Sequence, residues 1–302
     1  MAIRTWESEE YHSFWQKSDF AYLDRMERTI LRKFIESGNW FIDIGGGYGR
    51  LLDLYRDRFS NVVISDYSIS MLEDANRRLI QEGIRNVTLI AADAHKLPFV
   101  DSAFNSAMMV RLIHHIVNPA PVIQEARRIL KPHGSFILEY QNKRNFSFLI
   151  KARLGLMKRQ DLRTLDPYEA GPMYWIFHPR AIGRLVSDGF ILNQTLGGGI
   201  FWRRKFLNTI FPRLELIDST VARFLGRHTL THQIFLKLQV QKESPQIDLA
   251  AEGHPKSILD LLKCPGCGFA ALKNIDSSVI CLHCRQAFPV CGYLYDFRLS
   301  DK

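Results

Sequence analysis

Amphipathic stretches and short apolar runs alternate along the first two thirds of this chain. Apolar residues recur at helical spacing over residues 18–37, and the apolar run at 40–44 then stops at glycines. The pattern continues with helices expected over 51–55, 71–79, 121–130 and 181–187, and strands over 62–64, 87–90, 107–110, 136–138 and 190–194. This alternation predicts a parallel sheet with right-handed crossovers, covered on both faces.

Two segments interrupt the alternation. Residues 141–179 are basic with interleaved aromatic residues, and residues 197–229 form a second insertion. The strand expected over 233–240 follows them, and its isolated position suits an antiparallel edge. The predicted division is a main domain, a polar linker and a small cysteine-containing module, at residues 1–242, 243–256 and 257–302.

The main chemical signal lies where the strand at 40–44 ends, in the sequence Asp-Ile-Gly-Gly-Gly-Tyr-Gly-Arg at residues 43–50. Glycines there let the backbone turn sharply and approach a ligand that a Cβ atom would repel. A dinucleotide site would need glycine or alanine at position 50, which is Arg50 here. A phosphate loop is also unexpected, because no Gly-Lys-Ser/Thr follows.

The spacing Asp-x-Gly-x-Gly-x-Gly resembles the first motif of class I S-adenosylmethionine-dependent methyltransferases, and the resemblance extends to about residue 140. It implies that Asp66 accepts hydrogen bonds from the ribose hydroxyls, that Tyr67 and Met71 pack against adenine, and that Asp93 takes the adenine amino group. The donor site that the resemblance implies consists of Asp43, Gly45, Gly46, Gly47, Gly49, Asp66, Tyr67, Met71, Ala92, Asp93, Ala94 and Arg111.

The same resemblance implies an α/β fold, a doubly wound Rossmann-like and mostly parallel sheet with an antiparallel last strand. Residues 111–115 and 128–134 resemble the family's fourth and fifth motifs. Two positions depart from the family pattern, Asn105 where aspartate is common and His133 where glycine is common. Neither position touches the expected cofactor site.

Methyl transfer from a sulfonium mainly requires alignment of acceptor, methyl and sulfur and exclusion of water, so a catalytic residue is optional. If a base is used, His114 and His115 are the candidates, since ligands bind beyond the carboxyl ends of parallel strands. Methylation at C5 of a pyrimidine is not expected, because no cysteine precedes Cys264. Transfer to an oxygen, a nitrogen or another carbon atom remains open.

Charge and the insertions bear on the acceptor. The formal net charge is +9, which favours anionic partners. A basic, apolar lid would suit a hydrophobic or lipid-like small molecule, with peripheral contact to a membrane surface. The same charges would serve an alternative acceptor, a tRNA, an rRNA or a translation component. A third interpretation, a catalytically silent scaffold, fits poorly with the intact glycines and carboxylates.

All five cysteines lie in the last forty or so residues. Two Cys-x-x-Cys pairs, formed by Cys264, Cys267, Cys281 and Cys284, predict a structural zinc site rather than a redox pair. We expect His283 to point outward and Cys291 to be a spare, partly buried thiol. Residues 257–297 resemble small zinc-ribbon proteins that activate certain methyltransferases, which implies that the module packs on the main domain or binds a protein partner.

The first ten residues lack the apolar stretch of a signal peptide, and no apolar run approaches the roughly 18 residues needed to span a bilayer. Hydrophobic residues make up 46% of the chain and charged residues 24%, an ordinary globular balance. The sequence therefore predicts a cytoplasmic protein without a transmembrane segment.

Overall fold

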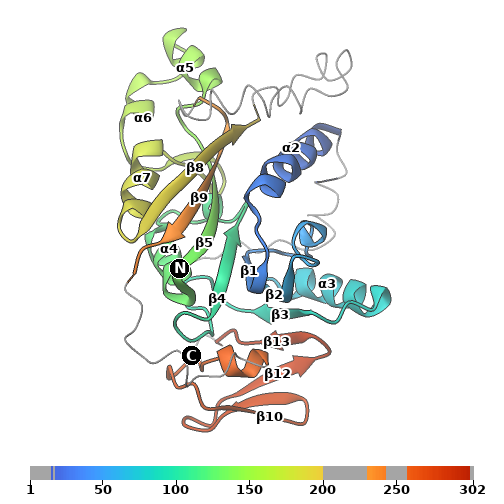
Figure 1. Cartoon of the computed structure of the whole chain (residues 1–302). Coiled ribbons are helices and arrows are strands. Elements are labelled where there is room, and N and C mark those ends of the chain that lie inside the picture. Colours follow the sequence, from blue (N-terminus) through green and yellow to red (C-terminus); the bar gives the residue numbers. More distant parts are fainter. Residues whose placement is uncertain (1–14, 16–17, 200–229, 243–256, 300–302) are drawn as a thin grey trace. The chain divides into compact units, whose positions relative to one another are not determined.

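The computed structural model describes residues 15, 18–199, 230–242 and 257–299 (Figure 1). Most of the predicted second insertion and all of the predicted linker lie outside the described residues. The chain forms two compact units. The first unit takes in residues 1–35, 109–120 and 136–239, and the second unit takes in residues 36–108, 121–135 and 240–302.

The second unit is built on a parallel sheet with the strand order β3-β2-β1-β4. Its strands are β1 (Gly38–Ile44), β2 (Phe59–Asp66), β3 (Val87–Ala91) and β4 (Phe104–Met109). Ile42 lies opposite Val63, and Ile64 lies opposite Leu89. All four of these side chains are buried, as expected for parallel strands covered on both faces.

Helices connect these strands. The helix α3 (Ile69–Glu82) begins at Ser68, whose hydroxyl accepts a hydrogen bond from the amide of Met71, and ends at the left-handed Gly83. The helix α4 (Ala120–Ile129) leads into β5 (Leu130–Gln141). The helix predicted over 51–55 is wrong: only the 3-10 turn η1 (Leu52–Leu54) forms, because the chain must return to β2 at Phe59.

A cysteine module, residues 257–299, completes the second unit. It contains η3 (Ile258–Leu261), β10 (Leu272–Ile275), β11 (Ser278–Cys281), β12 (Ala287–Cys291) and β13 (Leu294–Asp296). Consecutive strands pair antiparallel, and β13 then pairs in parallel with β3. Figure 1 shows β13 beside β3, with β12 and β10 continuing outward. The module therefore extends the sheet of the second unit.

The first unit begins with α2 (Ser18–Phe34), whose buried face carries Leu23, Met26, Ile30 and Phe34. It also holds η2 (Ile113–His115), β5 from Phe136 on, α7 (Pro179–Ser187), β8 (Phe190–Gly198) and β9 (Gln233–Val240). The strands β5, β9 and β8 are neighbours in that order. The predicted first insertion forms α5 (Phe146–Arg153), α6 (Arg159–Arg163) and the hairpin of β6 (Tyr168–Gly171) and β7 (Tyr174–Ile176).

These elements confirm the predicted α/β, Rossmann-like fold with a mostly parallel sheet and antiparallel last strands. The strands β5 and β8 are longer than the runs 136–138 and 190–194 from which they were predicted. No helix within the described residues is both long and apolar enough to cross a bilayer.

Candidate cofactor site and metal centre

The glycine turn after β1 is closed by hydrogen bonds to the end of β2. The amides of Gly45 and Gly46 both donate to the carbonyl of Ser65, over 2.7 and 3.2 Å. Gly47 has φ +54°, and a Cβ atom built on it would lie 2.5 Å from the terminal methyl of Met71. Positive φ is the left-handed conformation that favours glycine, so the turn uses glycine at this position as the sequence predicts.

Asp43 lies beneath this turn and is only 3% exposed. Its Oδ2 accepts a 2.8 Å hydrogen bond from the hydroxyl of Tyr55. Burial raises the pKa of Asp43 to about 7, against the opposing effects of the Tyr55 hydrogen bond and of Arg50. Asp43 thus supports the turn from inside, and direct contact with a ligand stays a prediction.

Asp66, at the end of β2, joins the glycine turn to the start of α3. Its Oδ2 accepts from the amide of Gly47 and its Oδ1 from the amide of Ser68, both over 2.9 Å. The residue is partly exposed, and burial raises its pKa although these bonds oppose the shift. Each carboxylate oxygen has two lone pairs, so Asp66 retains acceptor capacity for a ligand hydroxyl.

The loop after β3 lies next to the loop after β2. The amide of Ala92 donates to the carbonyl of Asp66 over 3.0 Å. Asp93 is partly exposed, and its Oδ1 accepts from the amide of His95 over 2.9 Å. The structure thus gathers eleven of the predicted donor residues at the carboxyl ends of β1, β2 and β3 and at the start of α3: Asp43, Gly45, Gly46, Gly47, Gly49, Asp66, Tyr67, Met71, Ala92, Asp93 and Ala94.

Arg111, the twelfth, belongs to the first unit and lies in a buried ionic network. Its amide donates to Glu139 over 2.9 Å and its Nε to Glu27 over 2.6 Å. Both carboxylates are completely buried, and Gln233 donates to both of them. Burial raises the pKa of Glu139 to about 6. A contact between Arg111 and the methyl donor stays a prediction.

Sequence reasoning missed this network. Glu27 lies four residues after Leu23 and three before Ile30, on the buried face of α2. A charged residue on the apolar face of an amphipathic helix is a signal that could have been used, because buried charges are almost always paired.

His114 and His115 lie against the hairpin of β6 and β7. Their ring centres are 4.1 Å apart, and the ring of Tyr174 is 4.8 Å from that of His114. His114 is buried, whereas His115 is partly exposed with its Nδ1 3.3 Å from the carbonyl of Met173. A carbonyl partner favours the tautomer that is protonated at Nδ1. Neither Tyr174 nor Met173 was singled out from the sequence.

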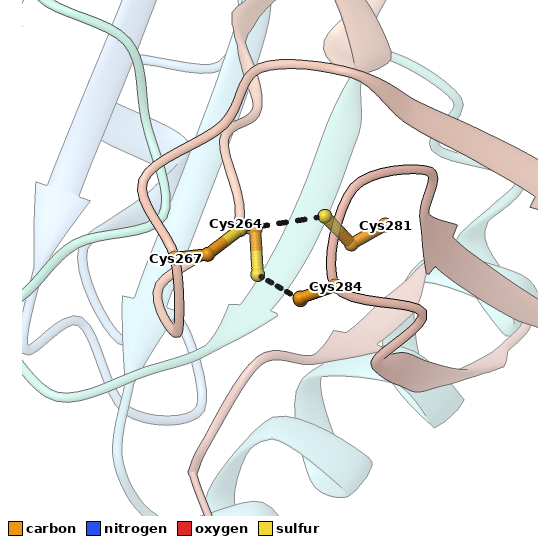
Figure 2. Close-up of side chains that lie close together, drawn as sticks. All are labelled: Cys264, Cys267, Cys281 and Cys284. Carbon is orange, nitrogen blue, oxygen red and sulfur yellow. Dashed lines mark hydrogen bonds between the residues drawn. The ribbon is translucent and has the colours of Figure 1, made fainter.

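The four paired cysteines converge from two loops, as Figure 2 shows. All four sulfur atoms lie within 4.8 Å of one another. The Sγ atoms of Cys264 and Cys284 are 3.6 Å apart, as are those of Cys267 and Cys281. Zinc–sulfur bonds of about 2.3 Å in a tetrahedron place sulfur atoms about 3.8 Å apart. The spacing and the thiolate donors therefore fit zinc.

The surroundings of the cysteines match the sequence prediction in part. Gly268 has φ +81°, and its amide donates to the carbonyl of Cys264, so the backbone turns under the site. His283 is exposed and stacks on Phe269, with ring centres 4.2 Å apart. The expectation that Cys291 is partly buried is wrong: it is exposed, because side chains alternate along β12 and Phe288 takes the inner face.

Sequence comparison identifies known proteins that are similar to part of this chain. Residues 42–138 match the family model described as a methyltransferase domain. The chain is 30% identical over 165 residues to the ubiquinone/menaquinone biosynthesis C-methyltransferase UbiE of Coxiella burnetii, covering 50% of this chain and 62% of that protein. It is 34% identical over 132 residues to UbiE of Pseudomonas paraeruginosa, covering 41% and 50%. The chain thus spans less than two thirds of these relatives.

Solved structures show the same fold. A S-adenosylmethionine-dependent methyltransferase from Aquifex aeolicus superimposes with a TM-score of 0.51 at 14% identity, covering 78% of this chain and all of that one. The PH0226 protein from Pyrococcus horikoshii gives a TM-score of 0.52 at 20% identity, covering 75% and 93%. These likenesses show a Rossmann-like fold, and the family model adds that residues 42–138 of this fold are similar to a methyltransferase domain.

Proposed function

We propose that this protein transfers the methyl group of S-adenosylmethionine to a ring carbon of an apolar, quinone-type small molecule. One observation supports the donor half most directly: the Asp66 carboxylate links the glycine turn to α3 and keeps acceptor capacity at the end of β2. The acceptor half is supported by the relatives named C-methyltransferases of ubiquinone and menaquinone biosynthesis.

S-adenosylmethionine supplies an electrophilic methyl group on a sulfonium sulfur. In the proposal the open backbone of the glycine turn holds its methionine end, and Asp66 and Asp93 hold the nucleoside. The fit rests on the hydrogen-bonded glycine turn after β1 and on the acceptor capacity that Asp66 retains. A carboxylate that accepts hydrogen bonds from vicinal hydroxyls is the usual way to hold a ribose.

Methylation of a ring carbon also requires loss of a proton. The new carbon–carbon bond forms as the carbon–sulfur bond breaks, and the proton leaves from a hydroxyl or carbon of the acceptor. We assign removal of this proton to His115 as the base, because His115 is partly exposed whereas His114 is buried. The carbonyl of Met173 at Nδ1 favours the tautomer in which Nε2 carries the lone pair that a base needs.

The surface of α5 supports an apolar acceptor. Four large apolar side chains on this helix and directly after it are exposed, at fractions from 41% to 73%: Phe146, Ile150, Leu154 and Leu156. Lys151 and Arg153 lie in the last turn of the same helix. Exposed apolar side chains beside cationic ones suit an anionic lipid surface, in which a quinone-type acceptor would dissolve.

The donor half is tested by calorimetric titration with S-adenosylmethionine. We expect Asp66→Ala to weaken binding about 10-fold or more, the effect of losing hydrogen bonds to a charged group. Asp57→Ala is the matched control, because Asp57 is 79% exposed and pairs with the neighbouring Arg56. A wild-type protein that does not bind this donor would overturn the proposal and favour the silent scaffold.

The acceptor half is tested with S-adenosylmethionine carrying a deuterated methyl group. The protein is offered a demethylated quinone-type ring in its reduced, hydroquinone form in anionic vesicles and, in a parallel reaction, transfer RNA. The masses of the products are then measured by mass spectrometry. We expect the labelled methyl group on a ring carbon, and less of this labelled product with His115→Gln than with the wild type. Label on RNA with an unchanged ring would overturn the small-molecule acceptor.

A further inference from the structure

We infer that Arg298 of the cysteine module forms part of the nucleoside end of the donor site, where it fixes the ring of Tyr67. The inference rests on the proposed binding of S-adenosylmethionine and extends it. It assigns a positioning role to a residue more than 200 positions after the glycine turn, from a segment outside the matched methyltransferase domain.

The pairing of β13 with β3 brings Arg298 to the edge of the sheet at which the predicted donor residues lie. Asp296 lies opposite Ala91 in the parallel pairing of β13 with β3, and the amide of Phe297 donates to the carbonyl of Ala91 over 2.8 Å. Arg298 is the next residue. It therefore lies at the carboxyl end of β3, where the predicted donor residues Ala92 and Asp93 follow in the chain.

Two contacts fix the Arg298 side chain. Asp296 accepts hydrogen bonds from Nε and Nη2 of the guanidinium, both over 2.9 Å, which is the bidentate arrangement that holds arginine in one plane. The guanidinium carbon lies 5.7 Å from the centre of the Tyr67 ring, and Nη1 is 3.5 Å from the carbonyl of Tyr67. These distances place the cation over the aromatic face.

Tyr67 directly follows Asp66 and is the residue predicted to pack against adenine. An aromatic ring that is already held in place loses less freedom when a base stacks on it, so the ligand binds more tightly. Arg298 holds that ring from the module, and Asp296 holds Arg298. Affinity for the adenosine part of the donor should therefore depend on Arg298, whereas contacts to the methionine part should not.

The module is held on both sides of this point, which keeps Arg298 in register. Asn76 on α3 accepts from the amide of Tyr293 and donates to the carbonyl of Cys291. On the other side, the amide of Lys263 donates to the carbonyl of Pro98 over 3.0 Å. The position of Arg298 thus depends on the folded module and not only on its own side-chain contacts.

The test is calorimetric titration of the full chain with S-adenosylmethionine and with 5′-methylthioadenosine, which lacks the amino-acid end. We expect Arg298→Gln to weaken both ligands by the same factor, about 2- to 5-fold, the size of an exposed cation–aromatic contact. Lys273→Gln, an equal change of charge on the exposed face of β10, should alter neither affinity. Arg298→Lys, which keeps a cation, should restore part of the loss.

A double-mutant cycle separates positioning from general damage. In a Tyr67→Ala background Arg298→Gln should cause no further loss, because the ring it fixes is gone. Equal losses in both backgrounds, or unchanged affinities in the single variant, would overturn the inference while leaving the proposed function intact. If the wild-type chain binds neither ligand, the proposed function fails and the inference fails with it.

Discussion

The hydroxyl of Tyr55 donates a 2.8 Å hydrogen bond to the carboxyl of Asp43 beneath the glycine turn. Both groups are buried, and burial raises the pKa of each of them. The turn that is proposed to hold the methyl donor thus rests on an acid that takes up a proton near neutral pH. This has a consequence for stability.

Asp43→Asn should change how the free energy of unfolding depends on pH. In the wild type the folded state keeps the Asp43 proton up to about pH 7, whereas the unfolded chain releases it near 3.8. Stability therefore falls as pH rises between these values, by at most about 1.4 kcal/mol per pH unit. An asparagine side chain does not titrate. Urea denaturation should therefore show that the free energy of unfolding of the variant rises relative to that of the wild type from pH 4 to pH 7. A constant difference over that range would refute the assigned protonation.

Gly47→Ala should weaken donor binding out of proportion to its effect on stability. The added methyl would lie 2.5 Å from the terminal methyl of Met71 and 3.9 Å from Oδ2 of Asp66, between two predicted donor residues. The terminal methyl of Met71 must move to admit the added methyl, and Met71 is predicted to pack against adenine, so we expect a loss of roughly tenfold in affinity, or about 1.4 kcal/mol. Gly83→Ala is the matched control, since Gly83 has a similar φ of +65° and no atom within 4 Å of an added Cβ.

Both variants should lower the melting temperature, because alanine is strained at positive φ by about 1–2 kcal/mol. Only Gly47→Ala should weaken binding of S-adenosylmethionine in a calorimetric titration. Equal affinities in the two variants would mean that the side of the turn next to Met71 does not affect the ligand.

The sequence predicted those elements whose signal is local. Parallel strands are buried on both faces, so β1, β2 and β3 read as apolar runs, and α3 shows helical periodicity between a serine cap and a glycine. The apolar residues around Leu52 are buried too, but the segment is too short for more than a 3-10 turn. The polar start of β5 becomes strand through its neighbours in the sheet, which local patterns do not report.

The same distinction holds for the candidate site. The glycine turn, Asp66 and the paired cysteines are recognisable from short spacings. The bond between Arg111 and Glu27 joins residues 84 positions apart, and Arg298 lies 231 positions after Tyr67. Such pairs depend on how strands and helices are stacked, so a single sequence carries only an indirect sign of them, such as a charge on an apolar helix face.

Removal of the proposed metal should destabilise the cysteine module. Cys264→Ser should lose bound zinc and lower the melting temperature by roughly 5 °C or more, since even 2 kcal/mol has an effect of this size in a chain of such length. Cys291→Ser is the matched control, because Cys291 is an exposed thiol outside the cluster. Zinc content by mass spectrometry and thermal unfolding provide the readouts. Full zinc occupancy in Cys264→Ser would contradict a four-thiolate site.

Arg111→Gln should be one of the most destabilising single substitutions of a charged residue in the first unit. It removes the guanidinium that pairs with Glu27 and whose charge lowers the pKa of Glu139, and neither carboxylate has exposed surface. Breaking a buried ion pair typically costs about 3–5 kcal/mol, because the remaining charge is buried without compensation. Arg77→Gln, which breaks the exposed pair with Asp74, should cost at most about 1 kcal/mol.

The loss in Arg111→Gln should also depend on pH in a defined direction. Without the arginine, the pKa of Glu139, which burial already raises to about 6, should rise further. The folded variant then holds protons that the unfolded chain releases near the ordinary value of 4.5, so its deficit relative to the wild type should shrink as pH falls from 8 toward 5. Urea denaturation across this range measures it. A deficit equal to that of Arg77→Gln, or one that grows as pH falls, would show that the two carboxylates do not depend on Arg111.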